Sequence, residues 1–416
     1  MRKIIILAII VAGSAGAATY YVDSVNGLDD PSWNGGPGDP WQTITYALSR
    51  VSGENTFMCR GEFEEGVEVG RDDYSSTFIA NSQAAIRGSI VSIDEVVTLE
   101  LDDFDIFGFA GGGCKAYVKV NDCYFNCPSG PAFCIDRFHG GGVAYNCVFE
   151  DCMSVISITA FEFGSARFEG CEVKNCEGGI SYSGEASVSA TGCKFYDVAG
   201  TAFGASMWGE FATLSSCEII NCGTGAAIGG SRYGASGAVR NSLFKYNTKP
   251  IRAYYDNENW GGIEISENLV TENGGSGIEV GGVKIKLRRN AVTENDGSGV
   301  YVTEGAPDLG TPKDPGRNVF AGNKSGYDVY NASSENIPAC GNSWDPQSEQ
   351  EMEGKTWQEV NVTRIHDHWD DPNVGYVMWS EPMSGVAPAS LGRIKASFGT
   401  ENGPEQTNTA PMIDRP

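Results

Sequence analysis

Carboxylates, cations and aromatic rings are concentrated in one strip of the chain, between residues 136 and 260. Three of its acids, Glu162, Glu185 and Glu210, follow one another at intervals of 23 and 25 residues. If the fold repeats with this period, neighbouring carboxyl groups would lie about 5–10 Å apart, the range that glycoside hydrolysis uses. These glutamates are therefore candidate catalytic residues, although a solvated turn would also explain each of them.

A lyase would need another arrangement, in which a base removes the proton beside a substrate carboxylate while a cation supports the developing charge. Arg232, Lys249 and Arg252 could supply that base. We count Arg232 among the candidate catalytic residues, but the sequence around it contains no recognisable motif for such a base.

Aromatic side chains accompany these charges. Their rings stack on the apolar faces of sugars, while sugar hydroxyls bond to acids nearby. The strip is therefore typical of a surface that binds carbohydrate. The candidate substrate-binding residues are Trp208, Tyr233, Arg252, Tyr254, Tyr255 and Trp260.

A second charged pattern lies further along the chain, where Lys284, Lys286 and Arg288 occupy alternate positions. On a strand these three side chains share one face. They could meet an anionic polymer, or they could form an ordinary solvated strand.

Two clusters have residue types that bind metals. His366 and His368 would share a face and could hold a metal with Asp370. Their place near the end of the chain favours a structural role, and no metal site is predicted there. The second cluster could bind calcium, the one cofactor left open, but its spacing matches no known loop and a turn-rich cap is the simpler interpretation. It consists of Asp23, Asn26, Asp29 and Asp30.

A short repeated phrase sets the period of the strip. From Cys123 onward its first positions are separated by 24, 24, 22, 24, 25, 26, 22, 28 and 24 residues. Within each copy polar and apolar residues alternate with a period of two, which indicates short strands with one buried face. The clearest copies are Cys147–Cys152, Cys171–Cys176, Cys193–Val198, Cys217–Cys222, Ser242–Asn247, Asn268–Asn273, Asn290–Asn295 and Asn318–Asn323.

One such unit cannot bury its inner face alone, whereas stacked copies can. We therefore predict an all-β, right-handed parallel β-helix of about eleven coils with three short strands per coil, over residues 59–345. The leucine pattern of leucine-rich repeats is absent, and the period is too short for a β-propeller.

The chain has 13 cysteines, most of them at the repeated positions. Stacked in successive coils they would form a ladder, which we interpret as reduced, buried thiols that behave as small hydrophobic residues. Disulfides between coils, for instance Cys147 with Cys171, remain open because stacked Cα atoms fall near the permitted range. A metal-binding array is less favoured because no paired C-x-x-C motif is present.

The first residues predict export. Residues 1–18 combine a basic start, the apolar run Ile4–Val11 and small residues before Ala18, which is the pattern of a signal peptide. The formal net charge of −25 repels phosphate backbones, so nucleic acid is excluded as a partner. Asp and Glu exceed Lys and Arg in the sequence. We expect a secreted or extracellular monomer without a membrane span.

Motifs at both ends resemble those of secreted bacterial right-handed β-helix repeat proteins with the pectate-lyase-like fold. The N-terminal motif comprises Tyr21–Asp30 and Gly38–Leu48, and the C-terminal motif comprises Arg364–Asp371 and Gly375–Val377. The resemblance implies an N-terminal strand and capping module over residues 19–58, with a helix from Thr43 to Val51. It also implies a closing segment over residues 346–397, and we expect the remaining residues 398–416 to be a disordered tail.

The group that the chain resembles contains lyases, glycoside hydrolases, epimerases and proteins without known catalysis. Fold analogy alone does not choose among them. We expect an exported protein that binds extracellular polysaccharide at the cell surface or in the matrix without transforming it. The alternative is a polysaccharide lyase or glycoside hydrolase that works in a groove along the strip.

Overall fold

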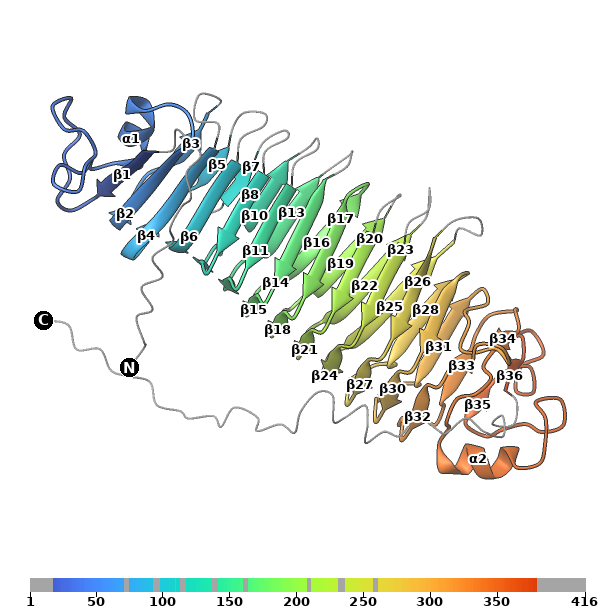
Figure 1. Ribbon diagram of the computed structural model, residues 1–416. Helices are drawn as coiled ribbons and strands as arrows, with labels where there is room; N and C mark the ends of the chain where they lie inside the picture. Colours follow the sequence, from blue (N-terminus) through green and yellow to red (C-terminus); the bar gives the residue numbers. More distant parts are fainter. Residues whose placement is uncertain are drawn as a thin grey trace, which may run out of the picture.

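The computed structural model describes residues 18–70, 75–92, 98–108, 110–112, 117–136, 141–159, 164–207, 211–230, 236–256 and 261–379. The chain winds into one long rod, with β1 and α1 at one end and α2 at the other (Figure 1). Its strands pair in parallel from coil to coil, so the predicted all-β parallel β-helix is confirmed. The predicted signal peptide, apart from Ala18, and the predicted tail lie outside the described residues.

The larger of two long sheets, the first sheet, has 21 strands in the described ranges. From β8 onward most coils contribute two consecutive strands to it. These strands are β1 (Ala18–Asp23), β2 (Asn55–Phe63), β4 (Ser75–Ile86), β6 (Thr98–Ile106), β8 (Tyr117–Asn121), β9 (Tyr124–Phe125), β11 (Gly141–Tyr145), β12 (Val148–Glu150), β14 (Ser165–Glu169), β15 (Glu172–Lys174), β17 (Ser187–Thr191), β18 (Lys194–Tyr196), β20 (Phe211–Ser215), β21 (Glu218–Ile220), β23 (Ser236–Arg240), β24 (Leu243–Lys245), β26 (Gly262–Ser266), β27 (Leu269–Thr271), β29 (Ile285–Arg288), β30 (Ala291–Thr293) and β32 (Val319–Ala321).

The second sheet has 13 strands in the described ranges and receives one strand from each coil. Two short strands, β34 (Ile337–Pro338) and β36 (Val377–Met378), pair separately near the C-terminal end. The strands of the second sheet are β3 (Val67–Val69), β5 (Ile90–Ser92), β7 (Ala110–Gly112), β10 (Pro131–Asp136), β13 (Ser154–Thr159), β16 (Gly178–Gly184), β19 (Thr201–Met207), β22 (Thr224–Gly230), β25 (Lys249–Tyr255), β28 (Ile278–Gly282), β31 (Val300–Glu304), β33 (Val329–Asn331) and β35 (Ile365–His366).

The number of coils differs slightly from the predicted eleven. Within the described chain, β8 to β31 form eight coils of three strands, and β32 with β33 forms a ninth. Before them, the long strands β2, β4 and β6 each take the place of two strands. The first two of these early coils lack the repeated phrase, and the sequence pattern therefore missed them.

Short helices lie near both ends of the rod. α1 (Ile44–Arg50) begins after Thr43, whose side chain accepts a hydrogen bond from the backbone N–H of Tyr46, and it ends before Val51. The helix therefore lies within the range Thr43 to Val51 that the resemblance implied, one residue shorter at each end. α2 (Pro346–Met352) is capped in the same way by Asp345. Each cap satisfies a backbone donor that the first helical turn leaves unpaired.

The corners of each coil depend on a left-handed backbone conformation directly before the ladder position. Asn146 (φ 51°), before Cys147, and Asn221 (φ 56°), before Cys222, are examples. Asn, Asp and Gly tolerate this region best, which explains their frequency at these corners. The sharp turn directs the next side chain into the interior.

Cysteine occupies the ladder in the earlier coils and asparagine in the later ones, and the two residues fulfil similar hydrogen-bonding roles. Asn290 Nδ2 donates to Ile265 O (2.8 Å), and Cys217 Sγ lies 3.5 Å from Ala190 O, the corresponding carbonyl of its own preceding coil. Amide ladders of this kind are known in stacked strands. Eleven of the cysteines in the described ranges are seen as buried, free thiols, as predicted.

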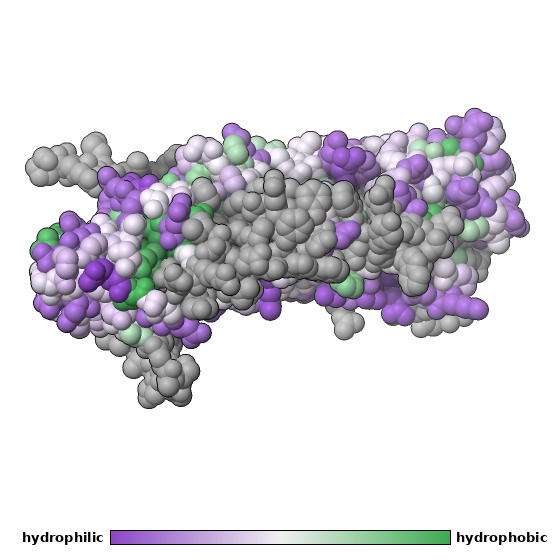
Figure 2. Space-filling model, turned by 90° about the horizontal axis from the view of Figure 1, so that it is seen from above, coloured by the Kyte–Doolittle hydropathy of each residue, from purple (hydrophilic) through white to green (hydrophobic). Residues whose placement is uncertain are grey.

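Aromatic rings fill the core along the rod. Phe125 and Phe149 stack with centroids 4.9 Å apart, and Phe57 and Phe78 with centroids 5.0 Å apart. In-register parallel pairing places residues from equivalent positions of the repeat above one another, so the core repeats with the same period as the sequence. Hydrophilic residues are spread along the outer surface of the rod, with a hydrophobic patch near the N-terminal end (Figure 2).

Candidate functional site

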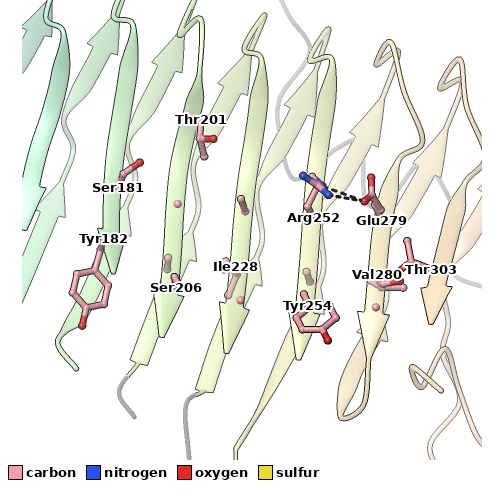
Figure 3. A pocket seen from close by; sticks show the side chains of 16 residues that line it. Ser181, Tyr182, Thr201, Ser206, Ile228, Arg252, Tyr254, Glu279, Val280 and Thr303 are labelled. Carbon is pink, nitrogen blue, oxygen red and sulfur yellow. Dashed lines mark hydrogen bonds and ion pairs between the residues drawn. The ribbon is translucent and has the colours of Figure 1, made fainter. Parts of the chain in front are cut away.

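A shallow hollow of about 550 Å³ crosses the outer face of the second sheet between β16 and β31 (Figure 3). Every second residue of these strands points outward. In one row these residues are Ser181, Gly204 and Ala227, and in the next row they are Ser206 and Gly229. Because none of the five carries a large side chain, they form a flat surface, which we call the small-residue floor.

An ion pair ends the first row of the floor. The register continues from Ala227 to Arg252 and Glu279, and the Arg252 guanidinium approaches Glu279 Oε1 at 2.9 Å (Figure 3). The two side chains are 48% and 28% exposed, so the pair presents both donors and acceptors to a molecule in the hollow. A pair this exposed contributes little to stability.

Tyr254 ends the second row and is 44% exposed. It leans toward β28, where a Cβ atom on Gly281 would come within 3.1 Å of the tyrosine ring. On its other side lies Gly229, where a Cβ atom would meet only Tyr254 O, at 3.8 Å. One ring face is therefore uncovered toward the floor, the arrangement that stacking of a sugar requires.

The described part of the predicted strip divides between the two sides of the sheet. Arg252 and Tyr254 line the hollow. Tyr255 is the next residue, and strand alternation places it in the core, where it is 0% exposed; this removes it from the predicted outer strip. Glu185 is partly exposed in the turn between β16 and β17 and does not line the hollow.

The other predicted residues lie outside the described ranges. These residues are Glu162, Trp208, Glu210, Arg232, Tyr233 and Trp260.

The row that contains Arg252 and Glu279 continues as a stack of rings that the sequence reasoning missed. Tyr301, Tyr330 and His366 follow in register, with centroids 5.2 Å and 4.0 Å apart. Their spacing from Arg252 by successive repeats was the available signal. Ring stacks along the rod present edges outward, so this row differs from the open face of Tyr254.

The three basic residues at and just before β29 differ in exposure. Lys284 and Lys286 are exposed, whereas the Arg288 side chain is only 5% exposed and binds Asp308 (2.6 Å) and Asp314 (2.8 Å). The three residues therefore do not form one solvated basic strip.

The clusters with metal-binding residue types fulfil structural roles. His366 stacks on Tyr330, and the His368 ring packs against Tyr376 with centroids 4.4 Å apart. Near the N-terminus, Asp23 accepts hydrogen bonds from the backbone of Val25 and Asn26. Asp29 similarly accepts from Gln42 and Thr43.

The chain was compared with protein families, curated proteins and solved structures. The family model "Periplasmic copper-binding protein (NosD)" matches residues 146–373. No curated protein matches the chain. Among solved structures, a rhamnogalacturonan lyase is 15% identical, with 66% of this chain and 82% of the other covered and a TM-score of 0.40.

Two further solved structures are similar at the same low level. Pectate lyase Pel9A is 12% identical, with 66% of this chain and 79% of the other covered and a TM-score of 0.36. Tailspike protein 3 of bacteriophage CBA120 is 11% identical, with 88% and 62% covered and a TM-score of 0.41. Identities of this size do not transfer an activity.

The described residues do not fit a copper site. Copper prefers thiolate, thioether and imidazole ligands, but no three His, Cys, Asp or Glu side chains of the described ranges are grouped to hold a metal. His366 Nδ1 lies 3.3 Å from Asn331 O and His368 Nδ1 lies 3.0 Å from Val374 O, so the two rings use separate carbonyls. The ladder thiols are enclosed in the core and directed at backbone carbonyls, as at Cys171 and Ala144 O.

In the described ranges no helix is both long and apolar enough to cross a membrane. The family that matches is a periplasmic one, which agrees with the predicted export. Because its model covers more than half of the sequence, the chain belongs to the NosD family.

Proposed function

We propose that this protein binds polysaccharide along the outer face of the second sheet, without transforming it. The observation that carries the proposal is the uncovered ring face of Tyr254 beside the small-residue floor. A sugar ring has an apolar face that packs on an aromatic ring and a rim of hydroxyls that needs polar partners. The hollow offers both.

Polar groups lie both within the floor and beside it. Arg252 has N–H donors and Glu279 has carboxylate oxygens, and both line the hollow. Ser181, Thr201 and Ser206 add hydroxyl groups, which both donate and accept. The hollow is shallow and crosses several coils, which suits a chain lying across the strands better than an enclosed small molecule.

The small number of carboxylates in the hollow favours binding over cleavage. Glycoside hydrolysis uses two carboxyl groups in distinct roles. Among the described lining residues Glu279 is the one carboxylate, and Arg252 already pairs with it. Glu185 stands apart in its turn. We place the protein outside the cytoplasm, at the cell surface or in the matrix, as a monomer.

The test is retention of the purified protein on a panel of insoluble plant and microbial polysaccharides, with and without calcium. New reducing ends and unsaturated products are followed in the same samples. Tyr254→Ala is the informative variant. Tyr117→Ala is its matched control, because Tyr117 is 41% exposed on β8 and its ring also lies beside a glycine, Gly141.

We expect retention on at least one polymer, without product, and affinity about 2- to 10-fold weaker in Tyr254→Ala than in the wild type. Tyr117→Ala should bind as the wild type does. Equal binding by the Tyr254 and Tyr117 variants would remove the site from this hollow. Product that accumulates with time would replace a binding function by an enzymatic one.

A further inference from the structure

A second hollow, of about 690 Å³, lies on the first sheet rather than the second. It crosses β20, β23, β26 and β29. Its floor is again made of small residues, among them Ser236, Ala238 and Gly262. Its two distinguishing features are one exposed aromatic ring and a group of cations.

The ring belongs to Phe211, which is 61% exposed, the second highest value among the large hydrophobic side chains of the described ranges. The register pairs Phe211 with Ser236 and Ser236 with Gly262. On the preceding coil, Val188 pairs with Ala212. Ser187 comes directly before Val188 and Phe211 directly before Ala212, so Ser187 lies beside Phe211. Because small residues flank the ring on both sides, its faces are open for stacking.

The cations are Arg240, Lys284 and Lys286, which line the same hollow. Lys284 lies beside Gly262, since a Cβ atom on this glycine would come within 3.3 Å of Lys284 Cβ. None of the three forms an ion pair with another residue of the described ranges. Glu264, between Ala238 and Lys286 in the register, is the one acid among the lining residues described.

Two of the carboxylates near Lys286 are bound by buried Arg288. The backbones of Lys286 and Asp308 pair in an isolated bridge, and Asp314, whose pKa is lowered mainly by the hydrogen bond from Arg288, also feels the charge of Lys286. Arg288 binds both of these carboxylates, at 2.6 Å and 2.8 Å. The positive charge of Lys286 is therefore left to face the hollow.

This local excess of three cations over one acid opposes the formal net charge of −25. From Phe211 to Lys284 the hollow spans three coil spacings, roughly 14 Å at ~4.8 Å each. We propose that it is a second binding site, which takes an acidic polysaccharide whose sugars carry carboxylates. The sugar faces stack on Phe211, and the carboxylates pair with Lys284, Lys286 and Arg240. The site acts independently of the hollow on the second sheet.

Affinity for soluble polygalacturonate, measured by titration at low and moderate ionic strength, tests this site. Methyl-esterified polygalacturonate keeps the sugar backbone and removes the charge. The double variant Lys284→Gln/Lys286→Gln removes two cations, and Glu264→Gln removes the opposing acid. Lys355→Gln is the control, because Lys355 is an exposed lysine in the C-terminal segment, away from both hollows.

We expect polygalacturonate to bind more tightly than its ester, with an affinity that falls as salt is added. The double lysine variant should bind about 3- to 10-fold more weakly, and Glu264→Gln about 2- to 3-fold more tightly. Lys355→Gln and Tyr254→Ala should leave this affinity unchanged. The proposal is overturned if the ester binds equally well, if the lysine variant matches Lys355→Gln, or if only Tyr254→Ala weakens binding.

Discussion

Replacement of Asn290 tests why the ladder can use either asparagine or cysteine. This side chain is fully buried and makes four hydrogen bonds. Nδ2 donates to Ile265 O (2.8 Å) and to Asn318 Oδ1 (2.9 Å). Oδ1 accepts from the backbone N–H (3.1 Å) and from the side-chain amide (2.9 Å) of Asn268.

Asn290→Val keeps most of the volume and removes all four bonds. The side-chain amide of Asn268 keeps its hydrogen bond to Val239 O, and Asn318 Oδ1 still accepts a hydrogen bond from the backbone N–H of residue 290. The backbone N–H of Asn268 and the carbonyl of Ile265 lose their partner in the ladder. At 1–3 kcal/mol for each of these two buried groups left unsatisfied, we expect a loss of about 2–6 kcal/mol.

Asn290→Cys should cost roughly half as much. A thiol at this position can still donate to the carbonyl, as Cys217 does toward Ala190 O. The chain also tolerates Val198 at a ladder position, so valine fits the available space. Urea unfolding followed by circular dichroism measures both variants against Asn361→Ala, an exposed asparagine that should cost less than 0.5 kcal/mol. Equal losses for the valine and cysteine variants would refute the hydrogen-bonding explanation.

Two further predictions concern titratable groups. The eleven cysteines whose thiols are seen to be free are buried in the core, and burial raises the pKa of the Cys222 thiol to about 11, so these cysteines should resist a thiol reagent until the protein is denatured, when all 13 should react. Rapid labelling of most thiols in the native protein, or fewer than 13 after denaturation without reductant, would contradict this. Burial also raises the pKa of Asp328 to about 6, although the charge of Arg364 opposes it. A carboxyl group whose pKa is raised on folding stabilises the protein below its unfolded pKa and loses this effect as the pH rises through the folded value. Between about pH 4 and pH 6 the wild type should therefore lose about 2 kcal/mol relative to Asp328→Asn in parallel urea titrations, and identical pH profiles for the two proteins would show that Asp328 does not titrate in this range.

The sequence predicted the coils well where the ladder phrase is regular. Cys147 and Cys152 lie at the two ends of β12, one corner apart, as their spacing required. The phrase is absent from β2 and β4, where one long strand replaces two and no ladder residue marks a corner. Periodicity could not find coils that lack the periodic residues.

The site was predicted only in part. Period-two alternation from Ile251 and Ala253 could have placed Tyr255 inside the coil and left Tyr254 outside. The role of Arg288 could not be predicted in the same way. Its partners Asp308 and Asp314 belong to an irregular segment that follows β31, and only the folded structure brings that segment over the strand.

The most direct test of the binding site adds a side chain rather than removing one. Gly229 has an ordinary strand conformation, and a Cβ atom there would meet nothing closer than 3.8 Å, so Gly229→Ile should fold normally. The new side chain would cover the open face of Tyr254. Ser189→Ile, at an outward position on β17 of the first sheet, is the matched control.

The measurement is the affinity of both variants for the polysaccharide that retains the wild type, together with their urea midpoints. We predict that Gly229→Ile binds at least about 10-fold more weakly with an unchanged or higher midpoint, since β-branched residues suit strands. Ser189→Ile should bind as the wild type does. Undiminished binding by a folded Gly229→Ile protein would contradict the proposal that sugars stack on Tyr254 above the small-residue floor.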